Sequence, residues 1–336
     1  MERAIMCPQC NAPLAPHKFA RSVVCGYCGA TVQLDGSSIS AELFHKAFRD
    51  WNSPTSYQIP AWLSVGDSHW AVGDVLANGD VSDVYAGQRA RWPTELVLIK
   101  VLRDRRDIVQ FDKEWETLQG LQQSEAPGAD LFSTLLPQPV LHGNISNGSH
   151  TGHRVSIFRW TSGFSHTFED VIRVYPQGLP PRASIWIWRR ILEVLSFLHN
   201  SRVAHGAVLP PHLLIQENEH GIRLVGYGAA GYLGEKLQSL LPRYESFYPK
   251  PARSLSVPLD LVMSARCIIA ILGGNPETGF LPGSVPPRLA QLVQQVAQTE
   301  FVASTKADAW SIREKLGVIA GEVFGAPQFI PIVMPS

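Results

Sequence analysis

Two Cys-x-x-Cys pairs near the N-terminus constrain the fold of this chain more than any other sequence feature. Cys7-Pro-Gln-Cys10 and Cys25-Gly-Tyr-Cys28 are separated by fourteen residues. Two such turns at this spacing bring four thiolates around one tetrahedral metal ion. Because four protein ligands leave no open position for water, the ion would stabilise the fold without catalysing a reaction. The sequence therefore predicts a structural Zn²⁺ site made of Cys7, Cys10, Cys25 and Cys28.

The residues around these cysteines predict a small, separate domain. Short strand-like pieces lie at 22–24 and 30–33, and Gly26 or Gly29 can adopt the positive φ that brings backbone amides close to the sulfurs. Disulfides or redox-active pairs are the alternative, and a cytoplasmic chain without a βαβ pattern disfavours them. Residues 1–35 are expected to resemble a zinc ribbon. The fifth cysteine, Cys267, lies in an apolar run and is interpreted as a packing residue.

Length and charge exclude several classes of protein. The chain has 336 residues, enough for two or three folding units, and its 29 basic residues balance its 29 acidic residues. A zero net charge gives no support for binding to nucleic acid or to a membrane surface. The start of the sequence does not resemble a secretory signal, and no run reaches the roughly 18 apolar residues of a membrane span. We expect a cytoplasmic protein.

The rest of the chain divides into a strand-rich half and a helix-rich half. Residues 36–69 form a linker with a helix expected at 41–48. Strands are expected at 81–85 and, as a buried strand, at 96–99. Long helices are expected at 184–200 and 259–272. This order predicts an α+β fold with two lobes and a cleft between them, where such proteins commonly bind ligands.

Several motifs occur in one order along residues 70–320. Leu76-Ala-Asn-Gly-Asp-Val-Ser-Asp-Val-Tyr85 contains Gly79, Val97-Leu-Ile-Lys100 ends an apolar strand, and a helical segment at 111–121 carries Glu114. Val203-Ala-His-Gly-Ala207 then continues through His212. In order and spacing these segments resemble the protein kinase family. The resemblance implies a bilobal protein-kinase-like fold, with a glycine-rich loop at Gly79 and a phosphate-pairing Lys100 whose partner is Glu114, or Glu116 as the fallback.

The same resemblance exposes losses at the reaction centre. Ala207 replaces the Asp that accepts the substrate proton, and His212 replaces the Asn that holds magnesium. Gly226 replaces the metal-binding Asp, and Leu209 replaces the loop lysine. Phosphoryl transfer depends on positioning and on charge neutralisation by metal and cationic groups. The resemblance therefore implies a pseudokinase with no catalytic residues, which binds ATP weakly, without Mg²⁺, or not at all. Asp260 and His205 are interpreted as architectural residues.

More narrowly, the zinc knuckle, the loop around Gly79, the segment 205–212 and the ending Gly325-Ala-Pro-Gln-Phe-Ile-Pro-Ile-Val-Met-Pro335 resemble bacterial zinc-ribbon kinase-like proteins. That group is associated with von Willebrand factor A and tellurium-resistance-type proteins, which the resemblance implies as partners. The expected domains are a zinc ribbon (1–35), a linker (36–69), a kinase-like N-lobe (70–163), a C-lobe (164–325) and a C-terminal tail (326–336).

Two alternatives to a scaffold or regulatory binding module stay open. One is an unconventional ATP-dependent kinase or nucleotidyl transferase, in which Asp80 or Asp83 holds a metal ion. The other is a nucleic-acid adaptor acting through the zinc ribbon, for which Arg3, Lys18 and Arg21 are few and lack interleaved aromatic residues.

Overall fold

The structure is a computed structural model of the chain. It describes residues 5–7, 13–14, 22–25, 28–33, 61–90, 95–161, 163–216, 220–238, 240–298, 300, 302–303, 306, 308–330 and 332–335. Helices and strands occur together, which confirms the predicted α+β class. The chain forms two compact units. The strand unit comprises Met1–Ile108 and Pro139–Ser162, and the helical unit comprises Val109–Gln138 and Gly163–Ser336. The helix expected at 41–48 lies outside the described residues.

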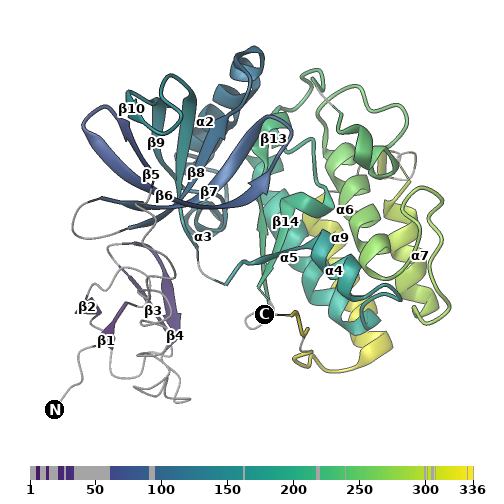
Figure 1. Ribbon diagram of the computed structural model, residues 1–336. Coiled ribbons are helices and arrows are strands. Elements are labelled where there is room, and N and C mark those ends of the chain that lie inside the picture. The colour runs from purple at the N-terminus through teal and green to yellow at the C-terminus, as the bar shows by residue number, and fades with distance from the viewer. Residues whose placement is uncertain are drawn as a thin grey trace. The chain divides into compact units, whose positions relative to one another are not determined.

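The strand unit is built on a curled, seven-stranded antiparallel sheet (Figure 1). In sheet order its strands are β10 (Asn147–Gly148), β5 (Ala61–Val65), β6 (Ser68–Asn78), β7 (Ser82–Arg89), β8 (Leu96–Leu102), β11 (Arg154–Arg159) and β9 (Pro139–Asn144). A short 3₁₀ helix, η1 (Arg105–Asp107), follows β8. Val97, Ile99 and Val101 of β8 are buried in the core of the sheet. The strand predicted at 96–99 is therefore confirmed, and β7 confirms the strand character predicted at 81–85.

The described N-terminal cysteines, Cys7, Cys25 and Cys28, lie among four short strands. β1 (Ile5–Met6) pairs with β2 (Pro13–Leu14), and β3 (Ser22–Val24) pairs with β4 (Thr31–Gln33). Both predicted strand-like pieces are present. Val32 and Leu14 are buried together with the described cysteines in a small separate core.

The helical unit contains most of the helices. These are α2 (Ile108–Gln122), α3 (Ala129–Phe132), α4 (Phe168–Val174), α5 (Pro181–Asn200), α6 (Val257–Ile271), α7 (Pro287–Val296) and α9 (Ala309–Phe324). Short 3₁₀ helices are η2 (Ser133–Leu135), η3 (Pro210–His212), η4 (Tyr227–Ala229) and η5 (Pro242–Phe247). Its strands are β12 (His166–Thr167), β13 (Val203–Ala204), β14 (Leu213–Gln216), β15 (Gly221–Leu224) and β16 (Gly231–Tyr232).

Helices α5 and α6 form the centre of the helical unit. α5 begins at Pro181, a residue whose fixed φ suits the first helical position, and it packs against both α6 and α9 (Figure 1). α6 is buried along nearly its whole length, which agrees with its apolar sequence. Both helices were predicted. Within the described part of the chain, no helix is long and apolar enough to cross a membrane.

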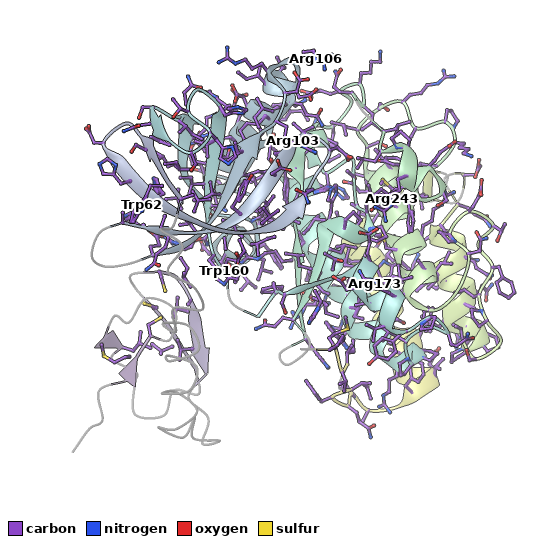
Figure 2. The ribbon with its side chains drawn as sticks, viewed as in Figure 1. Trp62, Arg103, Arg106, Trp160, Arg173 and Arg243 are labelled. Carbon is purple, nitrogen blue, oxygen red and sulfur yellow. The ribbon has the colours of Figure 1, made fainter. Side chains whose placement is uncertain are left out.

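Two ion pairs at the surface of the helical unit involve α4. Figure 2 labels Arg173 of α4 and Arg243 of η5. The Arg173 guanidinium lies 2.6 Å from Asp170, which also caps α4, and the Arg243 guanidinium lies 3.4 Å from Glu169. Because these arginines are largely exposed, each pair contributes at most about 1 kcal/mol.

Candidate functional site

The candidate site is a loop cluster in the helical unit, formed by residues 203–212 and 225–229 around Asp260. Asp260 lies in the first turn of α6 and is completely buried. Its Oδ1 accepts the Gly206 N–H at 2.9 Å, and its Oδ2 accepts the His205 N–H at 2.8 Å. His199 Nε2 lies 3.0 Å from the same Oδ2. A buried carboxylate is tolerated only when such donors satisfy it, so Asp260 fixes the loop's path.

Gly206 is required where Asp260 holds the loop. Its φ is +72°, and a Cβ there would lie 2.8 Å from the Ala229 carbonyl oxygen and 2.6 Å from the Leu255 side chain. Only glycine combines this conformation with this close approach. The architectural role predicted for Asp260 thus has a direct structural basis.

His205 is buried and neutral at physiological pH. Its Nε2–H donates to the Val225 carbonyl at 3.1 Å, and its Nδ1 accepts the Ala207 N–H at 3.3 Å. Burial, aided by the neighbouring His212, lowers the pKa of His205 from 6.5 to about 3. The ring therefore connects the two halves of the loop cluster, and both of its nitrogens are used in doing so.

Ala207 and Leu209, at the places predicted to have lost their catalytic side chains, are buried apolar residues. Ala207 contributes only backbone groups to the cluster: its N–H donates to His205 Nδ1, and its carbonyl accepts a hydrogen bond from His212 Nδ1 at 2.8 Å. Neither side chain can accept a proton or carry a positive charge. Neither residue can therefore act as a general acid or a general base.

His212 and Gly226 fit together. Gly226 has a φ of +80°, and a Cβ built on it would lie 2.6–2.8 Å from atoms of the His212 ring. Real Cβ atoms do not approach so closely, so the imidazole occupies space that a side chain at position 226 would need. The residues at the two positions where the resemblance places metal ligands are therefore sterically linked. The sequence drew attention to both positions but did not predict this contact, which joins positions fourteen residues apart.

Glu114 contributes to the same cluster from α2. Its side chain is buried, and its Oε1 accepts the Tyr227 N–H at 3.0 Å. Tyr227 is completely buried, and its ring packs edge-on against that of His205 with centroids 4.6 Å apart. Burial raises the pKa of Tyr227 above its ordinary value, so the phenol is neutral. Glu114 thus holds the backbone just after Gly226.

The predicted nucleotide-binding residues Gly79 and Lys100 lie in the strand unit. Gly79 closes the turn between β6 and β7, where its N–H donates to the Ser82 carbonyl at 2.9 Å. Lys100 is half-buried on β8, opposite Val84 and Ser156. Because Lys100 and Glu114 belong to different units, their pairing stays a prediction.

Of the two carboxylates in the transferase alternative, one has a cationic partner. Asp83 lies 3.6 Å from the Arg103 guanidinium, and Asp80 is exposed. The Arg103 charge beside Asp83 competes with a metal ion for that carboxylate, which disfavours a metal role for Asp83.

Three of the four predicted zinc ligands lie together. Cys7, Cys25 and Cys28 are buried, and their sulfurs all lie within 4.8 Å of one another. Cys7 Sγ and Cys28 Sγ are 3.5 Å apart, close to the roughly 3.8 Å that Zn–S bonds of about 2.3 Å give in a tetrahedron. Gly29 has a φ of +73° and donates its N–H to the Cys25 carbonyl, as expected for the turn. Cys10 lies outside the described residues.

Cys267, by contrast, packs inside α6. It is completely buried, its thiol lies 3.4 Å from the Val208 carbonyl oxygen, and burial raises its pKa well above the ordinary value. These observations agree with its interpretation as a packing residue.

No protein-family model matches this sequence, and a comparison with curated proteins found no similar one.

Proposed function

We propose that the chain is a pseudokinase that serves as a scaffold or regulatory module, combining a protein-kinase-like fold with an N-terminal zinc ribbon. The contact between His212 and Gly226 carries the proposal. In the alignment of motifs, both positions hold magnesium ligands in an active kinase. Here a hydrogen-bonded imidazole fills the space beside a glycine, and a metal-binding carboxylate would collide with it.

The other loop residues support the same proposal. Ala207 and Leu209 supply neither a base nor a cation, while Asp260, Gly206 and His205 maintain the loop through buried hydrogen bonds. A protein that keeps the architecture of a loop but not its reactive groups is suited to presenting surfaces. Nucleotide, if it binds, does so weakly and without Mg²⁺, because the two expected metal positions offer no carboxylate.

The cysteine cluster supports a structural zinc ion, for which Cys10 would complete a set of four thiolates. Four thiolates close the coordination shell, so the ion would stabilise the mini-domain without taking part in chemistry. The resemblance to bacterial zinc-ribbon kinase-like proteins suggests protein partners of the von Willebrand factor A or tellurium-resistance type.

The test is to incubate the purified full-length chain with labelled ATP and Mg²⁺, with and without a generic protein substrate. We expect no transfer of label to either protein. In parallel, the melting temperature is measured with ATP alone, Mg²⁺ alone and both together. We expect no rise that requires both, because ligand binding raises the melting temperature only when the site is formed.

Lys100→Ala serves as the matched variant. Transfer of label by the natural sequence that Lys100→Ala abolishes would show an active kinase and overturn the proposal. Transfer that disappears on further purification would indicate a contaminating kinase. Transfer that persists in purified Lys100→Ala would support the unconventional transferase and would also overturn the proposal.

A further inference from the structure

The segment that follows α9 lies along the helical unit, and its backbone is held by side chains. The Ala326 carbonyl accepts a hydrogen bond from Arg182 at 2.5 Å, and the Ile330 carbonyl accepts one from His220 Nε2 at 3.0 Å. The Tyr175 hydroxyl donates to the Val333 carbonyl at 2.9 Å and accepts the Val333 N–H at 3.0 Å. These contacts recognise backbone groups, which every peptide carries.

An aromatic stack adds a side-chain anchor. The His220 ring lies between those of Trp186 and Phe329, with centroid distances of 4.1 Å and 4.0 Å and an interplanar angle of 3° in each case. Phe329 remains 60% exposed, so it covers only one face of the stack. Trp186 comes from α5 and His220 precedes β15, whereas Phe329 alone belongs to the C-terminal segment.

The end of the segment alternates between buried and exposed side chains. Ile332 and Met334 are 4% and 9% exposed, whereas Val333 between them is 72% exposed. This period of two is typical of an extended chain that inserts every second side chain into a groove. Prolines at 327, 331 and 335 restrict the unbound conformations of such a segment and reduce the entropy lost on docking.

We propose that this groove, which we call the tail groove and define by Tyr175, Arg182, Trp186 and His220, is a peptide-docking site. It takes an extended, proline-flanked apolar segment with the chemistry of residues 326–335. The described residues of that segment, 326–330 and 332–335, occupy the groove in cis, so they compete with such a segment from a partner protein. The seated segment itself shows which chemistry the groove accepts.

Three of the four groove residues lie on elements that do not depend on the docked segment for their packing. Arg182 and Trp186 belong to α5, whose buried face packs on α6 and α9, and Tyr175 ends α4, which a capping box at Thr167 stabilises. Removing the segment therefore leaves the elements that carry the groove with their own cores. The groove residues are also separate from the loop cluster around Asp260, so its test does not depend on the pseudokinase proposal.

The experiment compares the full-length chain with a variant that ends at Gly325, using a labelled peptide of residues 325–336 as the probe. Fluorescence anisotropy should show that the shortened variant binds the peptide. The full-length chain should bind the peptide at least about tenfold more weakly. The reason is that its own tethered segment competes at an effective concentration of the order of millimolar. Equal binding by both proteins, or no binding by a folded shortened variant, would overturn the proposal.

Matched peptides identify the contacts. Phe329→Ala removes the ring that stacks on His220, and Ile332→Asp places a charge in a buried position, so each should weaken binding to the shortened variant at least about tenfold. Val333→Ala changes an exposed side chain and should leave binding within about twofold. A peptide set in which all three bind alike would contradict the groove as described.

A measurement on the intact chain covers the case in which the shortened variant does not fold. In hydrogen–deuterium exchange, the Val333 amide should exchange much faster than the buried amides of α5, because release of the segment is a local opening. Exchange at the same slow rate as α5 would mean that the segment leaves only on global unfolding. The proposal would then be wrong.

Discussion

At the scale of single residues, the loop cluster is a set of substitutions that fit one another. Gly226 gives room to the His212 ring, Ala207 gives that ring its carbonyl acceptor, and Asp260 holds the loop from below. In the resemblance to protein kinases, positions 207, 212 and 226 are those of catalytic groups. The contacts show that the residues at these positions form a packed arrangement of their own.

A double-mutant cycle tests the contact between Gly226 and His212. Gly226→Ala should destabilise the protein by about 2–3 kcal/mol, because the new methyl group meets the His212 ring and an alanine must adopt a positive φ. In a His212→Ala background the steric part should disappear, which leaves about 1 kcal/mol of backbone strain. Urea unfolding would measure the coupling, expected to be about 1–2 kcal/mol.

Gly234 provides the control for this cycle. It has a φ of +95°, but a Cβ there would meet no atom within 4 Å. Gly234→Ala should therefore cost only backbone strain, and equally in both backgrounds. If Gly226→Ala behaved like Gly234→Ala, the steric link would be wrong.

Because His205 is buried in its neutral form, we predict that the protein loses stability in mild acid. Its pKa is about 3 in the folded protein and near 6.5 in the unfolded chain, because burial and His212 oppose protonation more than Asp260 favours it. Below pH 6.5 the unfolded chain therefore binds a proton that the folded protein does not. The contribution of His205 to stability is complete above pH 6.5 and declines by up to about 1.4 kcal/mol per pH unit as the pH falls towards 3.

The comparison is between the natural sequence and His205→Gln, an amide that can still donate to Val225 and does not titrate. Free energies of unfolding in urea at pH 7, 6 and 5 should fall less steeply for the variant. An identical pH dependence for both proteins would show that another group dominates in this range.

At the scale of elements, the local sequence pattern predicted the helices and strands whose buried faces are visible as apolar positions in the sequence. Helices α5 and α6 carry apolar faces that the sequence displays directly, and β8 is a continuous apolar run. The sequence of the C-terminal segment, described at 326–330 and 332–335, has no such pattern. It is positioned by Tyr175 and His220, which lie more than a hundred residues away, so no local signal could reveal its docking.

The cysteine cluster at the β3–β4 hairpin leads to a prediction about the zinc content of the purified chain. Elemental analysis of the purified chain should give about one zinc ion per molecule. Cys25→Ser should lose it, because a hydroxyl is a poor ligand for Zn²⁺, whereas Cys267→Ala should keep it, since Cys267 lies inside α6. Cys10→Ser tests the fourth ligand in the same way. Zinc retained in full by Cys25→Ser would contradict the site.

At the scale of the whole molecule, the two units are not two halves of the sequence. Residues 109–138 join the helical unit although strand-unit segments flank them on both sides. Composition along the chain revealed a strand-rich part and a helix-rich part. It could not reveal that α2 packs with the helical unit and holds Tyr227 through Glu114, because that contact joins residues 113 positions apart.

The packing of His212 on Gly226 also sets the order in which this protein could change over generations. An acidic residue introduced first at position 226 would collide with the imidazole and would be removed by selection before any benefit appeared. A smaller residue at position 212 would have to come first, although by itself it brings no gain. On the proposed function, a change towards metal-dependent chemistry would therefore need two substitutions in a fixed order, first at position 212 and then at position 226.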